Sequence, residues 1–217
     1  MFSRVSLTWK ASALTIALSA LTVVALVIAS QYVMQQNIAQ DVIERQEKNL
    51  RIAATMMVRA VPGMEVEWTG EGNVARITVP ALPEFGNHDL IDQIGRMTGE
   101  TATLFVWDEE SKDFWRRTTN IKKGDGSRAV GTQLGQGGAV YPVVTRGETF
   151  LGEAVILGLP YYTIYEPIFD AAGKVVGILY AGVQKDRLAG RLSEMRVATG
   201  IAALAAILLA ALSGLWG

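Results

Sequence analysis

The stretch Tyr161–Tyr180, YYTIYEPIFDAAGKVVGILY, decides the fold. It contains one apolar run, 161–169, and most of a second, 174–183. The turn sequence Asp-Ala-Ala-Gly separates the two runs. Both runs are rich in β-branched and aromatic residues, which is typical of strands, and the short link between them has the chemistry of a tight turn. Consecutive strands joined in this way pair antiparallel. The stretch therefore predicts a hairpin within an antiparallel sheet.

Upstream segments extend this sheet. Period-two patterns predict strands, and one longer amphipathic segment and one short segment predict helices. We expect strands at 73–80, 101–107, 113–121 and 152–157, a helix at 88–97 capped by Asn87, a short helix at 139–146, and a Gly-rich loop over 122–138. With 217 residues the chain has room for one such domain. The predicted fold class is α+β, with an antiparallel sheet and the helices collected on one side.

The two ends of the chain differ in composition from its centre. All 21 acidic residues fall between Asp41 and Glu194, and the segments 11–31 and 197–217 are apolar and uncharged. Each is long enough to cross about 30 Å of hydrocarbon, so we expect two transmembrane helices. Arg4 and Lys10 then mark residues 1–10 as a cytoplasmic tail, and residues 32–196 are exported. A cleaved signal peptide is the alternative for the first segment.

Helical patterns continue from both predicted spans into the exported domain. Residues 32–61 have no Gly or Pro and carry an apolar stripe, and 184–196 return to helical periodicity after the core at 73–183. The sequence therefore predicts a long entry helix and an exit helix. The stripe is suited to packing on the domain's own sheet, to pairing with a second copy in a homodimer, or to both.

Composition excludes several classes of function. The chain has no Cys and a single His, and Lys+Arg (20) balances Asp+Glu (21), so thiolate chemistry, iron–sulfur clusters and nucleic-acid binding are disfavoured. No phosphate-binding loop, dinucleotide fingerprint or nucleophile elbow is present, and we expect neither an enzyme nor a cofactor. We interpret His88 with Asp89 and Asp92 as a helix N-terminus, and Asp108-Glu109-Glu110 as a solvated turn, rather than as metal sites.

The candidate site is a binding constellation. Arg116 and Arg117 lie within a predicted strand, and because side chains alternate, one of them should face the interior. A buried guanidinium needs an anion, either a small carboxylate ligand or an internal partner such as Glu153 or Glu166. Two strands further along the chain, hydroxyl-bearing side chains share one face and could surround a small polar ligand or serve as core residues. The full candidate set comprises Arg116, Arg117, Thr118, Tyr161, Thr163, Tyr165, Tyr141 and Phe105.

Three motifs carry a resemblance to a known family. They are DGSRAVGT at 125–132, GETFLG at 147–152, and the hairpin stretch 161–180. Over about 113–183 the chain resembles a single Cache sensor domain of bacterial methyl-accepting chemotaxis proteins. Arg116 falls where that family has the arginine of its D-F-x-R strand. Arg117 stands where the family usually has an aliphatic residue, and Trp115 is bulkier than its counterpart.

The resemblance implies an extracytoplasmic, PAS-like domain that binds small molecules, commonly carboxylates, and signals across the membrane as a dimer. We therefore expect a two-span protein of the bacterial inner membrane, the input half of a chemoreceptor for a small organic acid or amino acid. The alternatives are the input half of a histidine kinase or cyclic-dinucleotide enzyme, and a two-span scaffold whose sensor domain holds a protein partner in the membrane.

Overall fold

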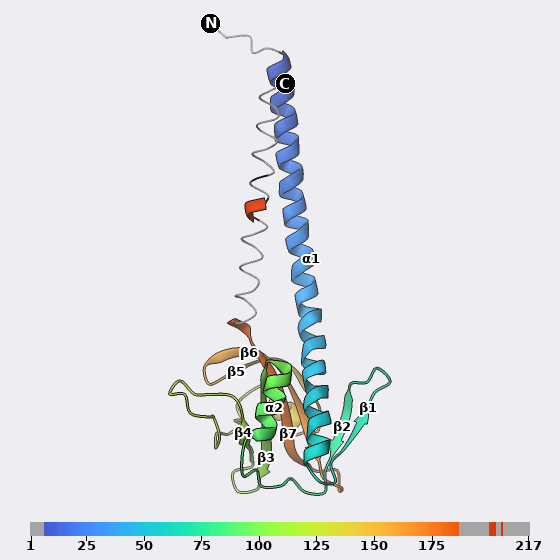
Figure 1. Ribbon diagram of the computed structural model, residues 1–217, viewed down its shortest axis with the longest axis vertical. Coiled ribbons are helices and arrows are strands. Elements are labelled where there is room, and N and C mark those ends of the chain that lie inside the picture. Colours follow the sequence, from blue (N-terminus) through green and yellow to red (C-terminus); the bar gives the residue numbers. More distant parts are fainter. Residues whose placement is uncertain (1–6, 187–199, 203–204, 206–217) are drawn as a thin grey trace. The chain divides into compact units, whose positions relative to one another are not determined.

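The computed structural model describes residues 7–186, 200–202 and 205, and it divides the chain into two units, 1–40 with 188–217 and 41–187 (Figure 1). The helices and strands follow one another as α1 (Leu7–Ala60), β1 (Glu65–Trp68), β2 (Val74–Thr78), α2 (Asp89–Thr98), β3 (Thr101–Asp108), β4 (Asp113–Thr119), α3 (Tyr141–Val144), β5 (Phe150–Ile156), β6 (Leu159–Phe169) and β7 (Val175–Gln184).

The first unit contains the N-terminal part of α1. Large apolar side chains there are 48–70% exposed, namely Leu14, Leu18, Leu21, Val24, Leu26 and Ile28. Within the described residues, no helix meets the combined length and hydropathy of a membrane span. Most of the segment expected to form the second span, 197–217, and most of the expected exit helix, 184–196, lie outside the described residues.

The second unit begins with the last five turns of α1, which lie against the sheet. The helix ends just before Pro62, where Val61 still donates its N–H to the Met57 carbonyl at 2.8 Å, and Gly63 then adopts φ 74°. Leu50 and Met57 are almost fully buried in a cluster shared with sheet residues. The apolar stripe of this helix therefore packs on the chain's own sheet over residues 50–61.

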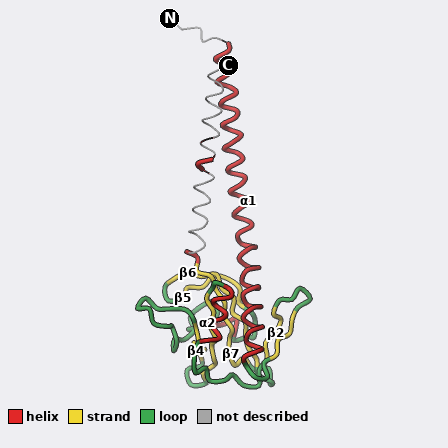
Figure 2. Tube along the Cα trace, viewed as in Figure 1, coloured by secondary structure: helices red, strands yellow, loops and turns green. Residues whose placement is uncertain are grey.

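The sheet has the order β1-β2-β6-β7-β3-β4, with β5 paired to β6. All pairs are antiparallel except β2 with β6, where Ile77 is opposite Ile168. The prediction of a purely antiparallel sheet is therefore wrong for this pair, and β1 was not predicted. The hairpin of β6 and β7 lies within the sheet as expected, and Figure 2 shows its strands among the others (yellow) beside the helices (red).

The two faces of the sheet bury two separate apolar clusters. The first contains α1 and α2 residues together with Leu104, Ile164 and Leu179, and the second contains Phe105, Tyr165 and residues of α3. The prediction that all helices lie on one side thus fails for α3. It is shorter than expected, four residues, and its Val144 packs on the opposite face from α1 and α2.

Helix α2 agrees with the predicted segment, but its cap differs. The N-cap residue is His88 and not Asn87, and the His88 side chain makes no capping hydrogen bond. Asn87 precedes the N-cap, and its Oδ1 accepts from the Asp89 N–H at 3.1 Å. Gly99 ends the helix in the left-handed conformation, at φ 73°, and donates its N–H to the Gly95 carbonyl. This geometry places Thr101, the first residue of β3, directly after the helix.

Replacing Gly177 with alanine should destabilise the domain. A Cβ there would lie 2.6 Å from Leu82 Cδ1 and 2.7 Å from the Phe105 carbonyl oxygen, and backbone cannot yield cheaply. We expect the free energy of unfolding to fall by about 1–3 kcal/mol, measured by chemical denaturation. Gly137→Ala is the matched control, because a Cβ there meets nothing within 4 Å. Equal stability of both variants would contradict this packing.

Candidate functional site

A β-bulge in β4 determines which side chains reach the second cluster. Phe105 pairs with Arg116 and Leu104 pairs with Thr118, so Arg117 is an extra residue at the register shift. Directly opposite side chains share a face, so Arg116 lies on the face of Phe105. Arg116 is buried and Arg117 is exposed. The inward arginine is therefore Arg116.

The same bulge separates Thr118 from Arg116. Thr118 lies on the face of Leu104, where its hydroxyl is 2.8 Å from His88 Nδ1 at the start of α2. It is buried, but on the side of the sheet that packs against α1 and α2. Of the three β4 candidates, the structure thus brings only Arg116 to the face of the tyrosines.

The Arg116 guanidinium is buried without a counterion. The residue is 5% exposed, its Nη1 donates to Thr132 Oγ1, and its Nε has no hydrogen-bond partner. The guanidinium carbon lies 4.9 Å from the centre of the Phe105 ring. Among the described residues no carboxylate lies within 4.0 Å of it. Desolvation lowers the pKa of Arg116, yet an arginine stays charged in a protein.

The candidates on β6 are brought to this face together. Tyr161, Thr163 and Tyr165 are all buried, and the Tyr165 ring lies 4.8 Å from that of Tyr180 and 6.2 Å from that of Phe105. Burial raises the pKa of Tyr165 and of Tyr180 above the ordinary range, so both phenols stay protonated. The Thr163 hydroxyl donates to the Gly152 carbonyl at 2.9 Å, which commits it to the sheet.

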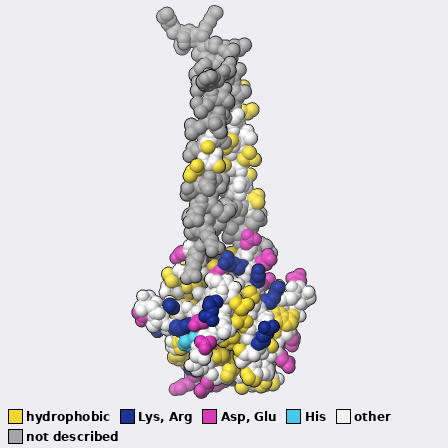
Figure 3. Space-filling view, in the orientation of Figure 1, with side chains coloured by type: hydrophobic (Ala, Val, Ile, Leu, Met, Phe, Trp, Pro, Cys, Tyr) yellow, Lys and Arg dark blue, Asp and Glu magenta, His cyan; other side chains and the backbone are white. Residues whose placement is uncertain are grey.

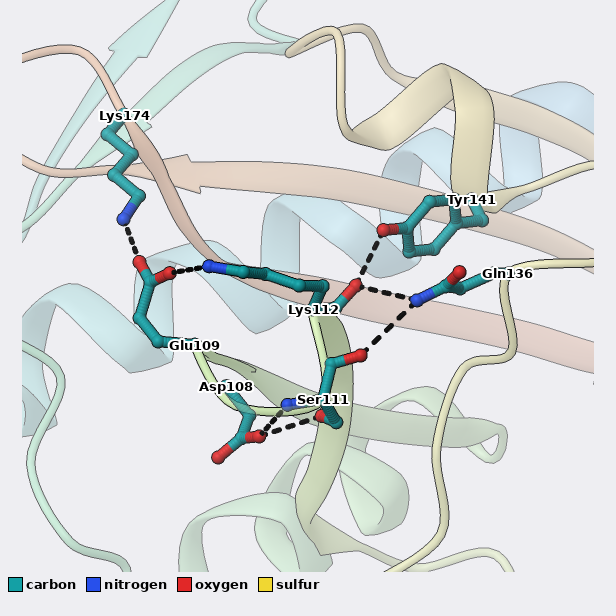
Figure 4. Close-up of polar contacts among 7 residues, drawn as sticks. All are labelled: Asp108, Glu109, Ser111, Lys112, Gln136, Tyr141 and Lys174. Carbon is teal, nitrogen blue, oxygen red and sulfur yellow. Dashed lines mark hydrogen bonds and ion pairs between the residues drawn. The ribbon is translucent and has the colours of Figure 1, made fainter.

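Tyr141 holds the long loop before α3 against the β3–β4 hairpin (Figure 4). Its hydroxyl donates to the Lys112 carbonyl at 2.6 Å, and Gln136 Nε2 donates to the Ser111 and Lys112 carbonyls at 3.3 and 3.1 Å. The Tyr141 ring also lies against Phe114 in the second cluster. Tyr141 is therefore close to the candidate site, but its hydroxyl is already used in fastening the loop.

The internal partners considered for Arg116 are wrong. Glu153 accepts from Lys185 Nζ at 2.7 Å, and Glu166 accepts from the Thr149 hydroxyl at 2.6 Å. Glu166 follows Tyr165 and so points to the opposite face of β6, which is lined by α1. It is 2% exposed, and desolvation raises its pKa to about 7. The buried cation and the buried carboxylate thus lie on different sides of one sheet.

Two acidic residues, Asp92 near His88 and Glu109 in the β3–β4 turn, have cationic partners within the protein. Arg128 Nη1 and Nη2 donate to Asp92 Oδ1 and Oδ2 at 2.8 and 2.7 Å, and this ion pair lowers the pKa of Asp92. In the turn, Glu109 pairs with Lys112 and Lys174 (Figure 4), and these hydrogen bonds lower its pKa to about 2. Across the described part of the chain, no group of three His, Cys, Asp or Glu residues is arranged to hold a metal ion.

Two residues of the site were not among the sequence candidates. Thr132 contacts the guanidinium of Arg116 and also pairs through its backbone with that residue, and the Tyr180 ring lies against that of Tyr165 in a tilted arrangement. Thr132 ends the DGSRAVGT motif, and Tyr180 has the same strand periodicity as Ile178 in β7. The motif and the strand periodicity could have identified these two residues. The backbone pairing of the loop at Gly131 and Thr132 with Arg116 of β4 has no sequence pattern of its own.

Comparison with known proteins identifies one family model. The model of the Cache 3/Cache 2 fusion domain matches residues 22–203. Among solved structures, the periplasmic domain of RsbU from Chlamydia trachomatis is 14% identical, with a TM-score of 0.36, covering 73% of this chain and 58% of that one. The C-terminal domain of the E. coli transcriptional regulator KdgR is 16% identical, with a TM-score of 0.26, covering 56% and 93%. No curated protein matches.

Removing the charge of Glu166 should stabilise the protein at high pH. In the folded state the pKa of Glu166 is about 7, against an ordinary value of 4.5. The folded chain therefore binds more protons between these values, and stability is lost as the pH rises from about 4.5 to 7. Glu166→Gln avoids this loss. Relative to the wild type, it should gain up to about 3 kcal/mol of unfolding free energy at pH 8, at about 1.4 kcal/mol for each pKa unit.

Urea denaturation at pH 5 and pH 8 measures this difference, and the gain at pH 5 should be much smaller. Glu110→Gln, at an exposed turn position, is the control and should change little at either pH. A Glu166→Gln variant that is less stable than the wild type at pH 8 would show that the carboxylate is held by a favourable charge partner.

Proposed function

We propose, because this chain belongs to the Cache 3/Cache 2 fusion domain family, that its residues 41–187 form a sensor domain that binds a small carboxylate, an organic acid or an amino acid. A Cache domain implies an extracytoplasmic sensor of small molecules. The finer assignment rests on the site: a guanidinium is a planar fork that suits a carboxylate, and hydrogen bonds from a charged donor are the strong ones.

The observation that carries this proposal is the unpaired burial of Arg116. Its Nε has no partner, and no described carboxylate neutralises it, so the folded domain bears the cost of desolvating a cation. A carboxylate ligand would supply the missing anion. Tyr165 and Tyr161 are buried on the same face of the sheet as Arg116. A protonated phenol such as that of Tyr165 can donate to a further oxygen of such a ligand.

The membrane arrangement is part of the proposal. The uncharged segments 11–31 and 197–217 would anchor the domain at both ends, with the sensor outside the cytoplasmic membrane. In support, large side chains of α1 between Leu14 and Ile28 are apolar and exposed, and Figure 3 shows the visible described ones (yellow) along this helix. We assign the chain to the input half of a chemoreceptor. The alternatives to a chemoreceptor are the input half of a histidine kinase or of a cyclic-dinucleotide enzyme, and a two-span scaffold that holds a protein partner.

The proposal includes a homodimer formed through the outer side of α1 and α2. A groove of about 560 Å³ runs between these helices, with Ile52, Met56, Leu90 and Met97 among its lining residues. Met97 is 65% exposed, although it is a large apolar side chain. A second copy of the chain would cover this surface symmetrically, as in most soluble oligomers. The opposite side of α1 is not available, because it is buried against the sheet.

Arg116→Met should remove carboxylate binding without unfolding the domain. The wild type, purified as the full chain in a mild detergent, is screened by thermal shift against organic acids and amino acids. A ligand present at 100 times its Kd adds about 2.7 kcal/mol of stability. The variant should show no such shift, while its own unfolding stays cooperative and its stability is equal or higher, since replacing an unpaired buried charge by an apolar side chain removes its desolvation cost.

Arg117→Met is the matched control and should keep the ligand shift, because that side chain is exposed. If Arg116→Met instead loses several kcal/mol of stability, the guanidinium has a structural partner. If Arg116→Met retains the full ligand shift, the carboxylate binds elsewhere.

Single cysteines should report the dimer, since the chain has no cysteine of its own. Substitutions at Thr55, Val58 and Met97, all exposed, are oxidised in membranes, and at least one should give a disulfide-linked dimer on a non-reducing gel. Thr145→Cys, exposed on the other face of the sheet, should stay monomeric. Crosslinking at Thr145 but at none of the three would reject this interface.

A further inference from the structure

A cavity lies on the face of the sheet opposite to Arg116. It has a volume of about 360 Å³ and is walled by α1, the β1–β2 hairpin, β5 and β6. Its lining residues are Glu47, Leu50, Thr69, Glu71, Asn73, Val74, Thr149, Leu151, Ile164 and Glu166. The cavity is built from four elements within the second unit, so its walls are held by the sheet and by the buried side of α1.

The cavity is lined by negative charge. Glu47, Glu71 and Glu166 contribute carboxylates, and no lysine or arginine is among its lining residues. Arg51 is the nearby cation, and its Nη2 donates to Asn73 Oδ1 at 2.5 Å. Asn73 in turn donates from Nδ2 to Glu47 Oε2 at 3.0 Å. The guanidinium therefore supports the rim through an amide and does not neutralise the interior.

Glu166 is the most buried of these carboxylates, at 2% exposure. Among the described residues it accepts one side-chain hydrogen bond, from the Thr149 hydroxyl to its Oε2 at 2.6 Å, and it lines the cavity. Burial raises its pKa to about 7, opposed only by the Thr149 hydrogen bond, so no cation of the protein offsets its desolvation.

We propose that this cavity is a second ligand site, which takes a small organic ammonium ion between Glu166 and the carboxylates at its rim. An ammonium group has three donors and needs acceptors around it, and the cavity offers carboxylates and the hydroxyls of Thr69 and Thr149. Its volume is at the lower end of small-molecule sites. The described carboxylates are not grouped closely enough to share a metal ion, which favours an organic cation.

The site is independent of the carboxylate proposed at Arg116, yet it shares a strand with it. Glu166 and Tyr165 are neighbours on β6 and point to opposite faces. An ammonium ion at Glu166 would also contact α1, since Glu47 and Leu50 line the same cavity. A cation would thus tie α1 to the sheet at the level of the other site.

Isothermal titration calorimetry of the full chain in amine-free phosphate buffer, with 1,4-diaminobutane as the probe, tests the proposal. The wild type should bind at pH 8 and lose about tenfold in affinity between pH 8 and pH 6, because a protonated Glu166 must first lose its proton. Glu166→Gln should bind at least tenfold more weakly at pH 8 and lose this pH dependence. Glu71→Gln is the second variant, at an exposed rim position, and should weaken binding less.

Three comparisons decide the outcome. Glu110→Gln, away from the cavity, and Arg116→Met, on the other face, should both bind the diamine as the wild type does, which separates this site from the proposed carboxylate site. No binding by the wild type at pH 8, or equal binding by Glu166→Gln, would overturn the proposal. Heat from CaCl₂ in a phosphate-free buffer at matched ionic strength, without heat from the diamine, would also overturn it in favour of a metal site.

Discussion

The alternation of side chains along β6 is the constraint on which the rest of this domain depends. β6 is eleven residues long and pairs with β5, β7 and β2. Its odd-numbered tyrosines face the cluster that holds Arg116, and its even-numbered Glu166 faces α1. A sheet keeps its two faces apart, so a buried cation and a buried carboxylate cannot neutralise each other across it. Neither has an oppositely charged partner within 4.0 Å among the described residues, and this is the ground on which a ligand is proposed for each.

Buried charges without partners are costly, and a domain tuned for stability alone would have replaced them. The contrast with Arg128 is instructive, because that side chain is held by both oxygens of Asp92 and by the Thr119 carbonyl, and so fastens α2 to β4. Arg116 has one hydroxyl and an aromatic ring instead. Arg128 is thus paired within the protein, whereas Arg116 has no carboxylate partner among the described residues.

Local sequence patterns were sufficient to predict most helices and strands. The pairing of strands that are distant in the sequence could not be predicted from them. The hairpin of β6 and β7, helix α2 and the identity of Arg116 as a candidate all followed from periodicity and turn chemistry. The bulge at Arg117 places Thr118 on the face of the sheet opposite to Arg116, and the alternation of residues along the strand gave no sign of this bulge. The parallel pairing of β2 with β6 joins segments about 90 residues apart, and the short, mostly exposed β1 has no buried face to create a pattern.

The separation of the two buried charges can be measured directly by the titration of the Glu166 side-chain carboxyl carbon. The experiment uses ¹³C NMR of the full chain in amine-free buffer, with the resonance assigned through Glu166→Gln. We expect an apparent pKa of about 7 in the wild type and the same value in Arg116→Met, because the sheet lies between the two groups. An apparent pKa near 4.5 in the wild type, or one that rises when Arg116 is removed, would show instead that the carboxylate has a cationic partner.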